Sequence, residues 1–175
     1  MELSSMTEEI KSHRLLVHAD TDELTPHMDN FRPKDLIAEV IRDLGFNALS
    51  CGLNLAMNPD VSTKIIKSDP VILRRVLLNL IKNNLEASIE DERVSLSCFE
   101  TSGGITISVQ NHRYIPIDVQ HLIFQRSYST KGVGSRTGTY SEKLFIEEYL
   151  QGQVWFESAG ETGTIFYLHL PLDLN

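Results

Sequence analysis

Long apolar runs and disulfide-forming cysteines are scarce in this sequence, and each scarcity excludes a class of protein. No run of about 18 apolar residues occurs, so no segment is expected to span a membrane. The N-terminus lacks the apolar core of a secretory signal. The only cysteines, Cys51 and Cys98, stand far apart in apolar contexts. They are expected to be buried thiols in the reducing cytoplasm, not a disulfide or a metal site.

Basic clusters are also missing. The 16 Lys and Arg residues are outnumbered by 24 Asp and Glu residues, which gives a net charge of −8. This balance argues against a nucleic-acid-binding surface. The remaining composition, 41% hydrophobic and 23% charged over 175 residues, is that of an ordinary globular protein with room for one sizeable core.

Apolar residues at helical spacing predict three longer helices. A short polar helix over residues 5–18 and a turn-rich connector over 19–30 are expected to precede them. Pro33 suits the first turn of one helix, and Gly45 is expected to stop or break it. Ser68 or Asp69 can cap the N-terminus of another helix. Gly152 is placed to close the third. The predicted ranges are 33–44, 70–88 and 140–152.

Alternating apolar and polar residues predict about six strands, and turn residues join the later ones into hairpins. The segments are 52–60, 61–68, 93–100, 104–111, 153–158 and 163–171. The helix and strand pattern indicates an α/β (α+β) two-layer sandwich. Its mixed, mostly antiparallel sheet would pack on about three helices.

The helix over residues 70–88 carries a polar stripe. One side of this helix carries Asn79, Lys82, Asn83 and Glu86. Asparagine has a low helix propensity, so propensity does not explain why two asparagines stand here. The stripe can be a solvated face. Alternatively, the oxygens of Asn79 and Asn83 bind a hydrated Mg²⁺ or a phosphate, with Lys82 or Glu86 nearby. The helix alone leaves both interpretations open.

The loop "STKGVGSRTG" is a second candidate. It places Lys131 among glycines, and Gly138 and Thr139 lie just before the next helix. Backbone N–H groups at a helix start, beside a cation, can hold phosphate. A plain flexible loop fits the same composition.

Thr164, directly after Gly163, is a third candidate. Either it presents its hydroxyl to a ligand, or it is only a residue of a buried strand.

In this order, "NLIKNNLEAS", "VQNHRYIP", "IFQRSYSTKGVGSRTGTYSEKLF" and "GTIFYLHLP" resemble the ATP-binding catalytic domain of sensor histidine kinases, within the GHKL ATPase group. The resemblance covers roughly residues 31–172. It implies an ATP-binding catalytic domain over 31–175, and a segment over 1–30 that ends the dimerisation and phosphoacceptor region.

The resemblance also implies roles for individual residues. Asn83 matches the Mg²⁺ ligand, Asn79 lies one turn before it, and Thr164 matches a threonine that helps hold adenine. The glycine-rich loop matches the ATP lid, and the residues it would bring near the phosphates are Lys131, Gly132, Gly134, Gly138 and Thr139.

The strand-end motif "VQNHRYIP" departs from the family pattern Asp-Asn-Gly-Pro-Gly-Ile-Pro. Matched on Ile115, the adenine-binding Asp becomes Gln110, Asn111 is retained, and His112 and Tyr114 replace both glycines. Glutamine can still accept a hydrogen bond from the adenine amino group, but without charge the bond is roughly half as strong. The lid reads Gly-Ser-Arg-Thr-Gly where Gly-x-Gly-Leu-Gly is common.

The implied function is binding of Mg·ATP and presentation of its γ-phosphate to a histidine. No histidine here precedes a glutamate, so the phosphoacceptor domain would lie elsewhere, in cis or in a dimer, and a response regulator would follow. The runner-up is a degenerate GHKL domain that serves as a docking or phosphotransfer scaffold. An ATP-driven conformational machine is disfavoured because Asn79 occupies the position of its water-activating Glu.

Overall fold

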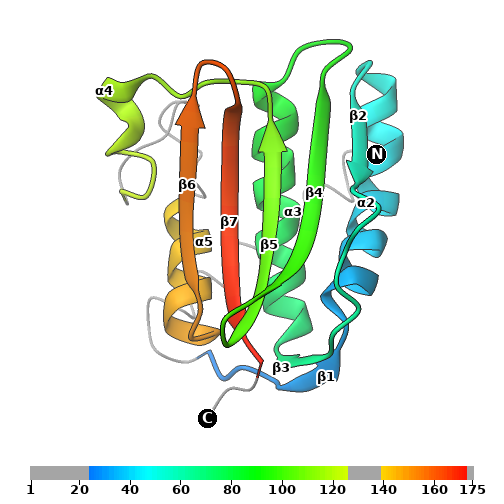
Figure 1. Ribbon diagram of the computed structural model, residues 1–175, viewed down its shortest axis with the longest axis vertical. Coiled ribbons are helices and arrows are strands. Elements are labelled where there is room, and N and C mark those ends of the chain that lie inside the picture. Colours follow the sequence, from blue (N-terminus) through cyan, green and yellow to red (C-terminus); the bar gives the residue numbers. More distant parts are fainter. Residues whose placement is uncertain (1–23, 126–138, 173–175) are drawn as a thin grey trace.

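The computed structural model describes residues 24–125 and 139–172 and contains a five-stranded sheet backed by helices (Figure 1). The strand order is β2-β4-β5-β7-β6. β2 pairs with β4 in parallel and the other neighbours pair antiparallel. The strands are β2 (Asn54–Met57), β4 (Arg93–Thr101), β5 (Gly104–Asn111), β6 (Gln153–Ala159) and β7 (Gly163–Pro171). The mixed, mostly antiparallel sheet is therefore confirmed.

The helices lie on one face of this sheet and leave the other face bare (Figure 1). The first two are α2 (Pro33–Ser50) and α3 (Pro70–Ala87). The third, α5 (Thr139–Leu144), continues as a π-helix over Phe145–Tyr149. The one-turn helix α4 (Ile117–Gln120) lies beside the end of β6, at the outer edge of the sheet (Figure 1). The two-layer α+β architecture is confirmed, with the core between the layers.

α3 is the central helix, and its start follows the sequence prediction. Asp69 is the N-cap, and its Oδ1 accepts hydrogen bonds from the backbone N–H groups of Val71 (2.8 Å) and Ile72 (3.0 Å). Such a cap stabilises a helix by about 1 kcal/mol. Oδ2 of Asp69 also accepts from the His27 N–H (2.6 Å), so the same carboxylate ties the N-terminal connector to α3.

The predicted stop of the first helix at Gly45 is wrong. α2 continues to Ser50 because Ala48, 2% exposed, extends its apolar face by another turn. The left-handed residue after the helix is Gly52 (φ +70°), which suits a C′ position. Cys51 is exposed, so its predicted burial is also wrong. Cys98 is buried as predicted, and burial raises the pKa of its thiol to about 11.

A small two-stranded ribbon was missed. β1 (Asp29–Phe31) lies in the predicted connector and pairs antiparallel with β3 (Ile66–Ser68), which is all that forms of the strand predicted over 61–68. The Lys67 N–H donates to the Leu172 carbonyl (2.9 Å), so the ribbon is attached to the end of β7. Each of these two strands forms because it pairs with the other, although the two are far apart in the sequence.

The end of the third helix also differs from the prediction. Gln151 (φ +49°), not Gly152, has the left-handed backbone. Gly152 is needed for space instead, because a Cβ there would lie 2.2 Å from the His169 carbonyl oxygen. The helix predicted over residues 5–18 lies outside the described residues.

Candidate functional site

The candidate site is the corner where β5 ends, β7 begins and α3 finishes. Ile105, Ile107, Val109 and Asn111 occupy alternate positions of β5 and are buried, which places Asn111 on the side of the helices. Its Nδ2 donates to the Asn84 carbonyl oxygen of α3 (3.4 Å). Its Oδ1 accepts from the Arg113 N–H (3.0 Å). Asn111 therefore joins the strand end to the helix.

Thr164 lies directly opposite Asn111 in the β5–β7 register and is 1% exposed. Its hydroxyl donates to the Arg113 carbonyl oxygen (2.6 Å) and is 2.8 Å from the Ser158 hydroxyl. The Ile115 N–H donates to that same Ser158 oxygen (2.8 Å). The hydroxyls of β6 and β7 thus hold the loop over residues 112–116 in place.

Gly163 allows this close approach. Its φ is +73°, and a Cβ would lie 2.1 Å from the Asn111 carbonyl oxygen and 2.7 Å from the His112 Cα. Any side chain here would push the strand-end loop away from β7.

The bulky side chains of "NHRYIP" are either paired with another residue or exposed to solvent. The Arg113 guanidinium is drawn to Glu92, with Nε 3.2 Å from Oε2. Tyr114 is 44% exposed and His112 is exposed as well. The arginine side chain is thus paired with Glu92, and the tyrosine and histidine side chains are largely in contact with solvent.

The strand register argues against matching Gln110 to the family's adenine-binding Asp. Gln110 alternates with Asn111 and lies on the bare face of the sheet, where its Nε2 donates to the Thr162 carbonyl oxygen (3.2 Å). Asn111 occupies the helix-facing position beside α3 and opposite Thr164. The helix-facing corner is therefore occupied by Asn111 and not by Gln110.

The α3 polar stripe is only partly solvated. Asn79 and Asn83 are half-buried, whereas Lys82 and Glu86 are exposed. Amide oxygens suit a Mg²⁺ ion that keeps most of its waters. The half-buried Asn83, in the last two turns of α3 and next to Asn84 of the corner, fits that donor chemistry.

Asn84 is a buried polar residue of this corner that the sequence prediction missed. It is 1% exposed, its Nδ2 donates to the Leu80 carbonyl oxygen (2.8 Å), and its own carbonyl accepts from Asn111. Its buried Oδ1 has no hydrogen-bond partner among the described residues. The second asparagine of "NN" was the available signal, because an amide at an otherwise apolar helix position needs a partner.

A buried charge cluster was also missed. Glu142 of α5 is 1% exposed, and Arg75 of α3 is 7% exposed with its guanidinium carbon 4.2 Å from the Phe145 ring centroid. Burial raises the pKa of Glu142 to about 7, against the opposing effects of Asn79, Arg75 and Ser141. Burial likewise lowers the pKa of Arg75 to about 10, although Glu142 opposes this shift.

Four predicted phosphate-binding residues, Lys131, Gly132, Gly134 and Gly138, lie outside the described residues. Thr139, predicted to lie just before the helix, is the first residue of α5, and its hydroxyl donates to the Ile123 carbonyl oxygen. The beginning of α5 is thereby tied to the segment that follows α4.

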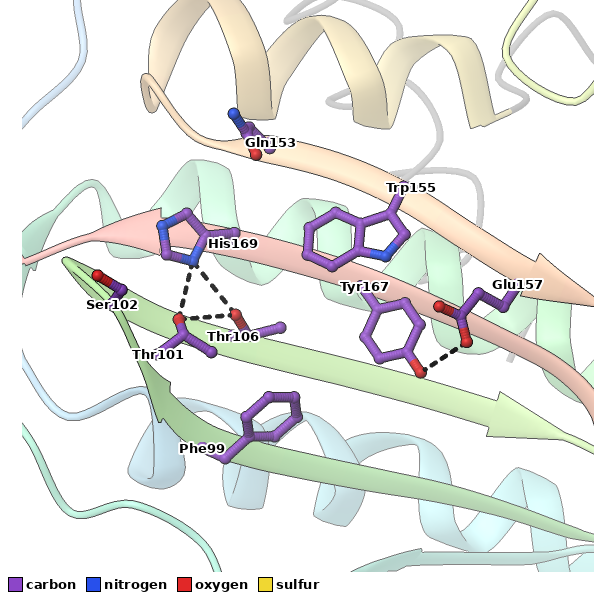
Figure 2. A pocket seen from close by; sticks show the side chains of 9 residues that line it. All are labelled: Phe99, Thr101, Ser102, Thr106, Gln153, Trp155, Glu157, Tyr167 and His169. Carbon is purple, nitrogen blue, oxygen red and sulfur yellow. Dashed lines mark hydrogen bonds between the residues drawn. The ribbon is translucent and has the colours of Figure 1, made fainter.

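A separate hollow of about 470 Å³ lies on the bare face of the sheet (Figure 2). Trp155 and Tyr167 stack there with ring centroids 5.1 Å apart, and His169 Nδ1 lies 3.1 Å from the Thr101 hydroxyl and 3.2 Å from that of Thr106. None of the predicted site residues lines this hollow. The candidate site is therefore the corner on the helix side.

No helix within residues 24–125 and 139–172 combines the length and apolarity that crossing a membrane requires. The same residues contain no group of three or more His, Cys, Asp or Glu side chains able to hold a metal ion.

Comparison with known proteins gives consistent results. The family model described as histidine kinase-, DNA gyrase B-, and HSP90-like ATPase matches residues 68–174. The adaptive-response sensory kinase SasA of Prochlorococcus marinus (strain MIT 9303) is 31% identical over 160 residues, which cover 82% of this chain and 42% of SasA. The chain thus spans less than half of that relative.

Solved structures share the fold. A nucleotide-free form of the catalytic domain of histidine kinase ThkA superposes with a TM-score of 0.75 at 24% identity, covering 85% of this chain and 99% of that one. A complex of ThkA with the response regulator protein TrrA gives a TM-score of 0.75 at 20% identity, covering 98% of this chain and 50% of that one.

Proposed function

The chain belongs to the histidine kinase-, DNA gyrase B-, and HSP90-like ATPase family, and we propose that it binds Mg·ATP and presents the γ-phosphate to a histidine outside residues 31–175. In such a transfer the protein contributes mainly positioning and charge neutralisation. The observation that carries the proposal is the corner of Asn111, Thr164 and Asn84 on the helix side of the sheet.

Adenine would be recognised in this corner by Asn111. The Arg113 N–H takes one of the two lone pairs of its Oδ1, which leaves the other for an amino group. Thr164 and Gly163 set where the strand-end loop runs, so their role is to hold Asn111 and its surroundings in position. Gln110 has no part in this recognition.

Magnesium would be held by Asn83, with Asn79 one turn before it and the remaining ligands supplied by water and phosphate. A bound Mg²⁺ neutralises phosphate charge. Lys82 and Glu86 are exposed at the edge of this stripe, so they would contact the ligand only from the edge of the site. Lys131, Gly132, Gly134 and Gly138 remain the proposed phosphate contacts, next to Thr139 at the start of α5.

The whole protein would be larger than this chain. Residues 31–175 would be the catalytic domain and residues 1–30 the end of a dimerisation and phosphoacceptor region. The partners would be that histidine domain, in cis or in a dimer, and a response regulator. The complex of histidine kinase ThkA with the response regulator protein TrrA supports the second partner, because ThkA has the same fold. The domain would work in the cytoplasm.

The experiment is isothermal titration of the 175-residue chain with the ATP analogue AMPPNP and Mg²⁺. Binding is expected, and Asn111→Ala should weaken it about tenfold or more, whereas Gln110→Ala should leave it within twofold. Absence of binding at millimolar analogue would contradict the kinase proposal and support a docking scaffold. Equal loss in both variants would overturn the assignment of Asn111.

A further inference from the structure

The hollow on the bare face of the sheet has an aromatic border (Figure 2). Thr106 lies on its floor and is only 2% exposed, because Phe99 and His169 flank it on the two neighbouring strands. Phe99 and Trp155 themselves remain 39% and 37% exposed. The solvated face of an antiparallel sheet usually carries polar side chains. Exposed rings around a hollow of about 470 Å³ therefore indicate a binding surface.

The polar groups at one end of the hollow satisfy one another. The hydroxyls of Thr101 and Thr106 are 3.1 Å apart, and His169 Nδ1 lies 3.1 and 3.2 Å from them. This closed triangle fixes the histidine ring, and both hydroxyls have partners without a ligand. A ligand would therefore be recognised mainly by the aromatic rings, Gln153 and Glu157.

The other end of the hollow favours a cation. Trp155 and Tyr167 stack with ring centroids 5.1 Å apart and an angle of 16° between their planes. The Tyr167 hydroxyl lies 3.4 Å from Oε2 of Glu157, so a carboxylate stands beside the stacked rings (Figure 2). Of the nine lining residues, Glu157 alone is acidic, and none is lysine or arginine. Aromatic ring faces and a carboxylate both attract positive charge.

An arginine side chain suits this chemistry better than a lysine side chain. The guanidinium is planar, stacks on aromatic rings, and can donate two parallel N–H groups to a carboxylate. The hollow lies at the surface, as the exposure of Phe99 and Trp155 shows, so a side chain carried on a protein segment can enter it directly. The net charge of −8 also attracts basic segments to this chain.

We propose that the hollow bordered by Phe99, Trp155 and Tyr167 is a docking site for an arginine side chain on a basic segment of a partner protein. The guanidinium stacks on the rings and pairs with Glu157. The site lies on the face of the sheet opposite the helices, apart from the corner proposed to bind nucleotide (Figure 1). The inference therefore does not depend on nucleotide binding.

Trp155 provides the assay, because it is the single tryptophan of the sequence and its fluorescence reports on this hollow alone. The 175-residue chain is titrated with the peptide acetyl-Gly-Gly-Arg-Gly-Gly-amide at millimolar concentrations and physiological salt. The matched probes have lysine or glutamine in place of the arginine. The arginine peptide should give a saturable change and bind about tenfold more tightly than the glutamine peptide, with the lysine peptide between them.

Matched variants separate the charge from the ring. Glu157→Gln should weaken binding of the arginine peptide about threefold to fivefold. Glu161→Gln, in the exposed turn between β6 and β7, changes the net charge equally and should leave binding within about twofold. Tyr167→Phe keeps the ring and should also stay within about twofold, whereas Tyr167→Leu should lose about fivefold. The melting temperature of each variant checks that it is folded.

Absence of a saturable change with the arginine peptide would overturn the proposal, as would equal affinities for the arginine and lysine peptides. Equal losses in Glu157→Gln and Glu161→Gln would also overturn it, because that result indicates general attraction by the net charge. Choline is the probe for a free organic cation, and tighter binding of choline than of the arginine peptide would contradict docking of a protein segment. Should Tyr167→Leu not fold, the comparison of the two glutamate variants decides, since both side chains are exposed.

Discussion

Replacing Glu142 by glutamine should change how the stability of the protein depends on pH. Glutamine keeps the size and polarity of the side chain but cannot ionise. The folded-state pKa of Glu142 is about 7, against 4.5 for a free carboxyl group. Between these two values the native protein retains a proton that the unfolded chain releases, so the stability of the wild type falls as pH rises through this window.

The size of the effect follows from the shift. One pKa unit corresponds to about 1.4 kcal/mol, so the wild type should lose roughly 2–3 kcal/mol relative to Glu142→Gln between pH 5 and pH 8. Below pH 4.5 the neutral glutamic acid and the glutamine should be nearly equivalent. Above pH 7 the variant should be the more stable protein, even though Arg75 has then lost its anionic neighbour. The reason is that desolvation of Glu142 outweighs the attraction of Arg75.

The assay is urea unfolding of both proteins at pH 5, 6, 7 and 8, with the difference between their free energies of unfolding plotted against pH. Taking this difference cancels the other titrating groups. In thermal melts the same effect should separate the two melting temperatures by about 4–12 °C at pH 8. A difference that is flat over this range, or that favours the wild type as pH rises, would refute the assigned environment of Glu142.

Three further substitutions have defined outcomes. Asn83→Ala should abolish the Mg²⁺-dependent part of AMPPNP binding in calorimetry while leaving the melting temperature nearly unchanged, and an unaltered Mg²⁺ dependence would contradict its role as the metal ligand. Thr164→Val should lower the free energy of unfolding in urea by about 1–3 kcal/mol, because the partly buried Arg113 carbonyl and Ser158 hydroxyl lose a partner. A loss under 0.5 kcal/mol would count against this network. Gly163→Ala should lower the melting temperature markedly through its positive φ and the 2.1 Å contact with Asn111, whereas the control Gly160→Ala, which has open space around it, should be nearly neutral.

The parts of the fold that depend on local chemistry were predictable from the sequence. Asp69 and Pro70 mark the start of α3, and Gly103 (φ +82°) supports the β4–β5 hairpin turn. The three-residue strands β1 and β3 were not predictable in this way, because each is stabilised mainly by the other and they are separated by more than 30 residues. Gly45 was misjudged because burial of Ala48 outweighs one unfavourable helix residue.

The candidate site was predictable as a region and not residue by residue. Matching this sequence to the family motif at Ile115 requires that the loop after the strand has the family's length. On that basis the adenine contact was predicted at Gln110. The alternation of Ile105, Ile107 and Val109 places Asn111, not Gln110, on the buried face, and that signal was already present in the sequence. Glu142 could not have been found, since its partners Arg75 and Asn79 meet it only when α5 packs on α3.

The position of β7 has a consequence for how the protein is made. β7, the last strand among the described residues, is inserted between β5 and β6 and pairs with both along its length. During synthesis, β6 therefore has no neighbour in the sheet until residues 163–171 leave the ribosome, and the edge of β5 stays open for the same interval. A chain that ends before Gly163 should expose both edges and aggregate, whereas one that ends after Pro171 can close the sheet.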